Sequence, residues 1–97
     1  MEADQLMRYF DEPSVETKVE NQGAVVSLHG KVTLGVGDVK LRKTILELLD
    51  EGVTNIVIDL EDVTTMDSCG IGELVAAYTA VSEKGGHLTL RHLPPKV

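Results

Sequence analysis

The residues that could do chemistry gather in one short stretch, Met66-Asp67-Ser68-Cys69-Gly70. Ser68 offers a hydroxyl and Cys69 a thiol, directly before an amphipathic pattern that predicts a helix. The free N–H groups and the dipole of a helix N-terminus favour a thiolate or a phosphate at such a place. The plainer interpretation is that Asp67 or Ser68 only caps the helix and that Cys69 is a small packed residue. The stretch is nevertheless our candidate site, because a cap needs one such residue and two more hydroxyls precede it, Thr64 and Thr65.

The three histidines and the single cysteine do not have the spacing of a metal site. Structural zinc sites use close pairs of ligands, and only His87 and His92 approach that pattern. On a strand, a separation of five residues would place these two side chains on opposite faces. Neither Gly35-Val36-Gly37 nor Gly70-Ile71-Gly72 completes a phosphate-binding glycine motif. We therefore expect no metal, no cofactor and no catalytic residues.

The composition limits the possible classes of protein. The chain has 97 residues, enough for one modest core, and carries Lys+Arg 9 against Asp+Glu 16 for a formal charge of -7. Such a charge argues against a nucleic-acid surface. The apolar runs are far shorter than the roughly 18 residues that cross a bilayer, and the first residues lack a signal-peptide pattern. We expect a cytoplasmic protein without membrane contact, whose partner is a protein or a small molecule.

The first part of the chain predicts an arm followed by a hairpin. Residues 1–14 show no sustained period and are expected to form an N-terminal arm, whereas residues 15–97 form the domain. Polar and apolar residues alternate over 15–20, and a second strand is predicted over 24–28. Asn21-Gln22-Gly23 supplies the turn between them, so these two strands should pair antiparallel.

The rest of the chain predicts alternating helices and strands. Glycines interrupt regular structure over 30–37, and Asp38 stands where the N-cap of an amphipathic helix is expected. The apolar run 55–60 is typical of a central strand covered on both faces, and residues 61–66 are predicted to be a loop. A second helix follows, with its apolar residues predicted to share one face: Ile71, Leu74, Val75, Tyr78 and Val81.

A last strand over 87–93 completes the order β-β-α-β-α-β. This order predicts an α/β domain with a mixed sheet packed by amphipathic helices, whose later strands pair in parallel. Successive β-α turns of such a sheet emerge at one edge. The loop 30–38 should therefore lie beside the turn 67–70.

The hexapeptide Asp67-Ser68-Cys69-Gly70-Ile71-Gly72 resembles the D-S-[ST]-G-[LI]-G pattern of the STAS domain of bacterial anti-sigma factor antagonists. The strand 56–60 precedes it, and a helix ending at Gly85-Gly86 follows it, so the resemblance extends over residues 15–97. It implies a STAS-like fold and a partner switch. In that family the serine after the aspartate, here Ser68, is phosphorylated by an anti-sigma factor that is a serine kinase. The unphosphorylated form binds this kinase and frees the sigma factor, and a PP2C-type phosphatase resets the switch.

The residues expected to bind the partner surround Ser68: Thr33, Thr65, Met66, Asp67, Cys69, Gly70 and Ile71. Cys69 stands where the family has a second Ser or Thr. Gly30-Lys31-Val32-Thr33 stands where the family reads Gly-x-Leu-Asp, so Thr33 replaces an aspartate. Only Ser68 is therefore left as the phosphoacceptor within the motif.

The family continues after the last strand with a helix, a strand and a closing helix, so we expect a C-terminally shortened version with an uncovered sheet face. A homodimer, or the apolar residues of the arm 1–14, would cover that face. Two other functions stay open, a scaffold STAS module of a stress-signalling assembly and a thiol enzyme or redox sensor that uses Cys69.

Overall fold

The computed structural model describes residues 14–20, 23–35 and 37–93. The predicted turn residues Asn21 and Gln22, and all of the predicted arm except Ser14, lie outside the described residues. The order β-β-α-β-α-β is confirmed. The elements are β1 (Ser14–Glu20), β2 (Gly23–Val32), α2 (Asp38–Asp50), β3 (Asn55–Met66), α3 (Ser68–Glu83) and β4 (His87–Arg91).

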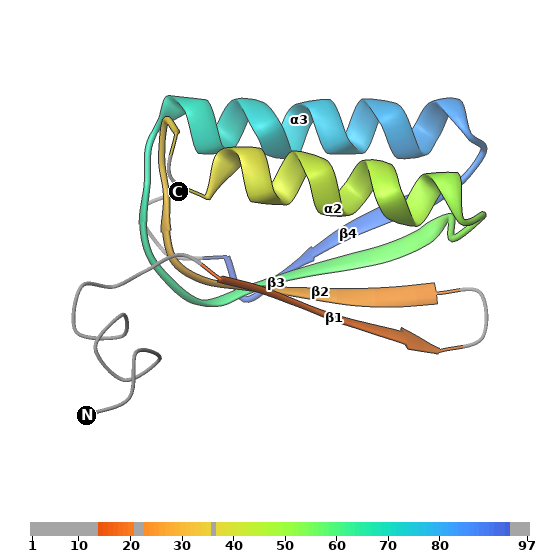
Figure 1. The fold of residues 1–97 in the computed structure, drawn as a ribbon, viewed down its shortest axis with the longest axis horizontal. Helices are drawn as coiled ribbons and strands as arrows, with labels where there is room; N and C mark the ends of the chain where they lie inside the picture. Colours follow the sequence, from red (N-terminus) through yellow and green to blue (C-terminus); the bar gives the residue numbers. More distant parts are fainter. Residues whose placement is uncertain (1–13, 21–22, 36, 94–97) are drawn as a thin grey trace.

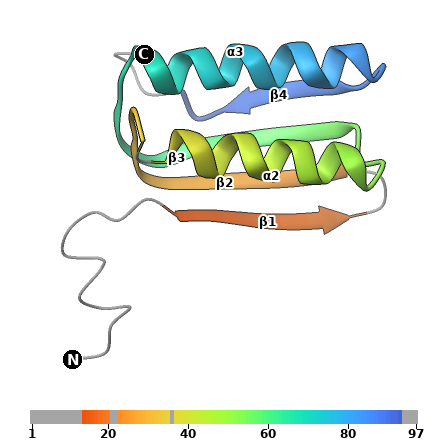
Figure 2. The ribbon, with the colours of Figure 1, turned by 45° about the horizontal axis from the view of Figure 1, so that its top comes forward.

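The four strands form one mixed sheet in the order β1-β2-β3-β4. β1 pairs antiparallel with β2, and the other two pairs are parallel. Both helices cover the same face of this sheet, as Figures 1 and 2 show. The reason is topological: each right-handed crossover adds the next strand in the same direction, so both helices fall on one side. No helix within the described ranges has both the length and the apolar character that a membrane span requires.

The prediction that strand 55–60 is covered on both faces is therefore wrong. In β3 the side chains of Ile56, Ile58 and Leu60 are buried under the helices, whereas Val57 and Asp59 on the other face are only half-buried. The core lies between the sheet and the helices. Its most completely buried side chains are Leu28, Leu41, Ile56, Ile58, Leu60, Val26, Val32 and Val81.

Both parallel inner strands are longer than predicted. β2 continues to Val32 and β3 continues to Met66, so the predicted loop 61–66 is a strand. The β-branched residues 63–65 favour an extended backbone, and the register pairs Val63 with Gly30 and Met66 with Val32. Two register shifts accommodate the extra residues of β3, and such irregularities hide the two-residue period in the sequence.

The start of α2 differs by one residue from the prediction. Gly37 is the N-cap, with a φ of 88° that favours glycine, and no side chain caps this helix. Asp38 is the first helical residue and is buried, and its Oδ1 accepts a hydrogen bond from the N–H of Val39 at 2.8 Å. The backbone conformation of Gly37, rather than a side-chain cap, thus accompanies the start of α2.

The prediction for the buried face of α3 is confirmed for Leu74 and Val81 and wrong for the other three residues. Gly70, Leu74, Ala77 and Val81 are buried, whereas Ile71, Val75 and Tyr78 are exposed by 42%, 61% and 57%. Small residues let α3 lie close to its neighbours, so the larger side chains point outward. Together with residues of β4 they line an apolar groove, formed by Ile71, Leu74, Val75, Tyr78, Leu88, Leu90 and Leu93.

Candidate functional site

Ser68 lies where β3 turns directly into α3. It is the first residue of the helix, and it is exposed. Asp67 precedes it as the N-cap with an extended backbone, and its Oδ1 accepts from the N–H groups of Cys69 and Gly70, each at 3.0 Å. This arrangement satisfies two helix N–H groups that would otherwise lack a partner. The cap is therefore Asp67, and the Ser68 hydroxyl is left available at the surface.

Asp67 also reaches a second loop. Its other oxygen, Oδ2, accepts a hydrogen bond from the N–H of Leu34 at 3.1 Å, although 33 positions separate the two residues. One carboxylate thus joins the start of α3 to the loop between β2 and α2. The N–H of Gly70, followed by that of Leu34, lowers the pKa of the Asp67 carboxyl below its ordinary value, because both donate to its charged form.

Gly70 brings α3 into direct contact with the end of β2. A Cβ at this position would collide with the carbonyl oxygen of Val32 and lie 2.8 Å from Cγ of Met66. Val32 and Met66 are themselves paired in the sheet. The carboxyl ends of β2 and β3 therefore form one compact corner with the first turn of α3, and the loop after β2 lies beside the turn 67–70, as the strand order predicts.

The structure brings the predicted partner-binding residues together at this corner, with different degrees of exposure. Thr65 and Ile71 are exposed, Thr33, Met66, Asp67 and Cys69 are half-buried, and Gly70 is buried. Thr33 makes an isolated bridge with Gly37 across the loop. The thiol of Cys69 is free. Gly70 is buried and Met66 is half-buried, so these two residues contribute more to packing at the corner than to its surface. Partner contact at all seven positions stays a prediction.

Leu34 is the residue of this corner that sequence reasoning missed. Its side chain is 71% exposed, the largest value among the exposed large hydrophobic residues of the described chain. It sits between Thr33 and Gly35 in a loop whose glycines have positive φ angles. The sequence did contain a signal for Leu34, because it is an apolar residue in a glycine-rich loop. Such a residue belongs to no strand or helix face that could bury it.

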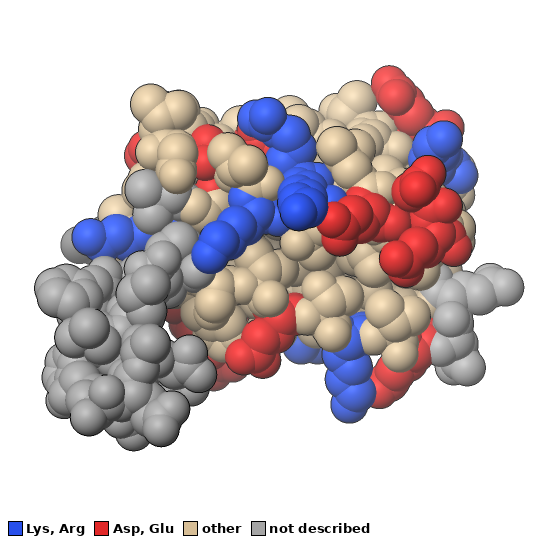
Figure 3. Space-filling view, in the orientation of Figure 1, with Lys and Arg blue, Asp and Glu red and all other residues tan. Residues whose placement is uncertain are grey.

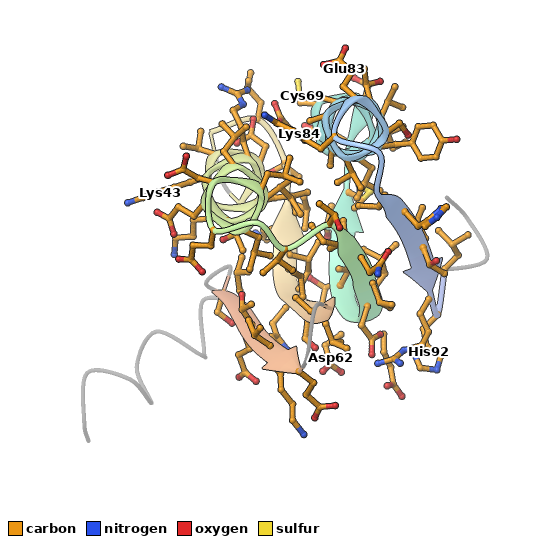
Figure 4. All side chains as sticks on the ribbon, turned by 90° about the vertical axis from the view of Figure 1, so that its right-hand side faces the viewer. Lys43, Asp62, Cys69, Glu83, Lys84 and His92 are labelled. Atoms are coloured by element: carbon orange, nitrogen blue, oxygen red, sulfur yellow. The ribbon has the colours of Figure 1, made fainter. Side chains whose placement is uncertain are left out.

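A group of possible metal ligands lies on the sheet face opposite the helices. Ligand atoms of Asp59, Glu61 and His92 lie within 4.8 Å of one another. His92 is not part of a strand, because β4 ends at Arg91 and His92 has a φ of 59°, so the predicted strand over 87–93 is too long. Figure 4 shows His92 and Asp62 on this side of the sheet, away from Cys69.

The Asp59 carboxylate already has partners on both oxygens. Nδ1 of His92 lies 2.9 Å from Oδ1, and the guanidinium of Arg91 donates to Oδ2 at 3.0 Å. The contact with His92, then the N–H of Glu61 and then the Arg91 hydrogen bond hold the pKa of the Asp59 carboxyl far below its ordinary range. A metal ion would have to displace the Arg91 pair, so the group is better described as an ion-pair network.

Charge is distributed unevenly over the helices. Figure 3 shows acidic side chains gathered over one end of the helical layer, with basic side chains beside them. A shallow groove at that end is lined by Glu47, Asp50 and Glu83 together with Arg42 and Lys43. This end is formed by the last turns of α2 and α3 and lies at the opposite end of α3 from Ser68.

The fold and the corner at Ser68 define the class of protein. Residues 15–97 match the family model described as "Mlab, STAS domain". The chain is also 30% identical over 84 residues to the anti-sigma-B factor antagonist of Bacillus subtilis (strain 168), which covers 87% of this chain and 75% of that protein. The chain therefore belongs to the STAS domain family of anti-sigma factor antagonists.

Solved structures share the fold at lower sequence identity. The anti-sigma factor antagonist SpoIIAA of Bacillus, in its unphosphorylated form, has a TM-score of 0.73 at 20% identity over 86% of this chain and 76% of that one. An anti-sigma factor antagonist from Mycobacterium paratuberculosis gives 0.71 at 24% identity over 82% and 67%. The murine anion transporter Slc26a9 gives 0.68 at 14% identity over 97% of this chain and 19% of that one.

Proposed function

We propose that this chain is a phosphorylation-controlled partner switch. In its unphosphorylated form it binds an anti-sigma factor that is a serine kinase, and it loses that partner when Ser68 is phosphorylated. The observation that carries the proposal is the exposed hydroxyl of Ser68 at the first position of α3, directly after the capping Asp67. The relationship to the anti-sigma-B factor antagonist supports it, as does the existence of SpoIIAA, which shares the fold, in a phosphorylated form.

The proposed reaction at Ser68 is carried out by the partner. The γ-phosphoryl group of ATP is transferred to Oγ of Ser68, the hydroxyl proton passes to a base of the kinase, and ADP leaves. A PP2C-type phosphatase would hydrolyse the ester and release inorganic phosphate. The chain itself acts by binding, and because sigma factors work with RNA polymerase the proposal places it in the cytoplasm.

The charge of the phosphate gives the switch its direction. It adds about -1.5 to -2 charges next to Asp67, whose carboxylate already accepts the N–H groups of Cys69 and Gly70. These are the donors that would otherwise receive a phosphate at a helix N-terminus. The phosphate must therefore compete with Asp67 for them, and burying both anions in an interface is unfavourable.

The test is phosphorylation of the purified chain by a candidate anti-sigma factor kinase with ATP, with the site located by mass spectrometry. Phosphate should be found on Ser68 and be absent from Ser68→Ala, while Ser82→Ala at the far end of α3 serves as the matched control. Ser68→Asp should bind the kinase at least about tenfold more weakly than Ser68→Ala. Phosphate on Thr64 or Thr65, or equal affinity of the two variants, would contradict the proposal.

A scaffold module is the second candidate function, and the apolar groove between α3 and β4 favours it. A scaffold subunit would use this groove to assemble, whereas a switch acts as a monomer or a dimer. Size-exclusion chromatography with light scattering separates the two functions, because a scaffold gives a mass many times that of the 10.5 kDa chain.

A further inference from the structure

An exposed leucine on its own is ordinary, but Leu34 is held in place by a residue of the candidate site. Its side chain is 71% exposed, and its N–H donates to Oδ2 of Asp67. Single exposed apolar side chains are common on protein surfaces, so the informative observation is the position of Leu34 next to the candidate site rather than its exposure alone. The bond to Asp67 fixes Leu34 beside Ser68.

The two oxygens of Asp67 do separate work. Oδ1 accepts from Cys69 and Gly70 and so caps α3, whereas Oδ2 accepts from the N–H of Leu34 in the loop before α2. Any good N-cap residue would satisfy the helix. The second bond is not needed for the cap, and its evident effect is to set the position of the loop.

Within the described residues of this loop, the tip at Gly35 lies in open space. Gly35 has a φ of 73°, and a Cβ added there would meet nothing within 4 Å, so the backbone next to Leu34 lies in open space. The bridge between Thr33 and Gly37 closes the base of the loop. The hydrogen bond to Asp67 is thus the contact that relates Leu34 to α3.

We propose that Leu34 is the apolar anchor of the partner surface and that Asp67 is the positioning residue that holds this anchor beside Ser68. The proposal rests on the partner-switch function proposed above. The partner is a protein that offers an apolar recess for Leu34, next to the groups that receive the Ser68 hydroxyl. Ile71, also exposed and one turn along α3, extends the apolar part of the same surface.

The role of Asp67 is tested by Asp67→Asn, which is nearly isosteric. Asparagine caps a helix about as well as aspartate through its one carbonyl oxygen. Its NH₂ group then faces the N–H of Leu34, which loses its acceptor. Asp67→Ala removes both functions. We expect Asp67→Asn to lower the thermal midpoint less than Asp67→Ala does, because the cap of α3 remains.

The first measurement needs no partner. Amide hydrogen exchange, read by NMR, should be about tenfold faster at Leu34 in Asp67→Asn than in the wild type. The amide of Val53, which donates to the carbonyl of Leu48 at 2.9 Å, is the control and should not change. An unprotected Leu34 amide in the wild type, or equal rates in both proteins, would overturn the positioning role.

The second measurement uses the kinase that binds in the phosphorylation experiment above. Leu34→Ala should weaken binding about tenfold or more, whereas Leu46→Ala, which removes an exposed leucine of α2, should change it less than about twofold. Asp67→Asn should weaken binding while leaving the fold intact. If Leu34→Ala binds like the wild type, the anchor is wrong and the switch stands. If no kinase binds the wild type, the switch fails, while the exchange rates still decide the role of Asp67.

Discussion

The helices α2 and α3 both follow a parallel strand and begin at the same edge of the sheet, but they begin in different ways. α2 starts at Gly37 through a backbone conformation, without a side-chain cap. α3 starts at Asp67, whose carboxylate caps the helix and also binds the loop of α2. The start of α3 presents side chains at the surface, among them the hydroxyl of Ser68, which a kinase could modify. The start of α2 is formed by the buried Gly37, which has no side chain to modify. The difference indicates why the candidate site lies at α3.

The largest expected effect is at the contact of α3 with β2. Gly70→Ala should destabilise the fold by about 3 kcal/mol, because its Cβ collides with the backbone carbonyl of Val32 and has no flexible neighbour to displace there. Gly72→Ala, two residues further along the helix, meets nothing within 4 Å and should stabilise by about 0.5–1 kcal/mol. Urea unfolding measures both. Equal effects of the two substitutions would show that α3 does not approach β2 so closely.

The next effect is on thermal stability and compares the first residues of the two helices. Asp67→Ala should lower the thermal midpoint by roughly 4–8 °C, since α3 loses its cap and the loop loses its tie. Asp38→Ala should change it less, because Asp38 accepts from its neighbour Val39 and does not serve as a side-chain cap of α2. Calorimetry decides this prediction. A larger loss for Asp38→Ala would reverse the comparison.

The order of elements and the candidate site could be predicted from the sequence because both depend on local signals. The periods of apolar residues and the motif 67–72 are such signals. The length of β3 could not be predicted, since Glu61 and Asp62 are typical of a loop and only pairing with β2 makes the segment a strand. The tie between Asp67 and Leu34 crosses 33 positions, so no local pattern indicates it.

The buried face of α3 could be predicted only in part, for a related reason. Ile71, Val75 and Tyr78 have the spacing of a buried stripe, but Gly70 and Ala77 let the other side of the helix approach the sheet. Leu74 and Val81 are buried as predicted, but the small residues Gly70 and Ala77 take the other buried positions instead of the larger ones. Hydrophobic spacing thus predicted part of the buried face of α3, and close packing against the sheet decided the rest.

The apolar stripe of α3 gives a third prediction, with α2 as the control. It lies over β4, an edge strand among the described residues, and forms a groove with Leu88 and Leu90. We expect a second copy of the chain to cover this groove. Tyr78→Lys should weaken self-association about tenfold or more, whereas Leu46→Lys on α2 should not. Sedimentation equilibrium measures it. A strictly monomeric chain would contradict the dimer, and a midpoint lowered by removing residues 1–12 would point to the arm instead.

The smallest expected effect is on how the free energy of unfolding changes at acidic pH. The N–H groups that Asp67 accepts lower its pKa in the folded state, so the folded chain binds a proton there less readily than the unfolded chain does. The contribution of this carboxylate to stability is therefore present above the unfolded pKa, near 4, and is lost as the pH falls through the lower folded value. Asp67→Asn has no such group, so the difference in stability between wild type and variant should shrink as the pH falls below about 4. Asp59→Asn is the comparison on the opposite sheet face, where the contact with His92, then the N–H of Glu61 and then the Arg91 hydrogen bond lower the pKa of the carboxyl. Urea midpoints of the three proteins between about pH 2 and 6 test this, and a difference that grows toward low pH would show that the Asp67 carboxylate is not stabilised by the N–H groups of Gly70 and Leu34.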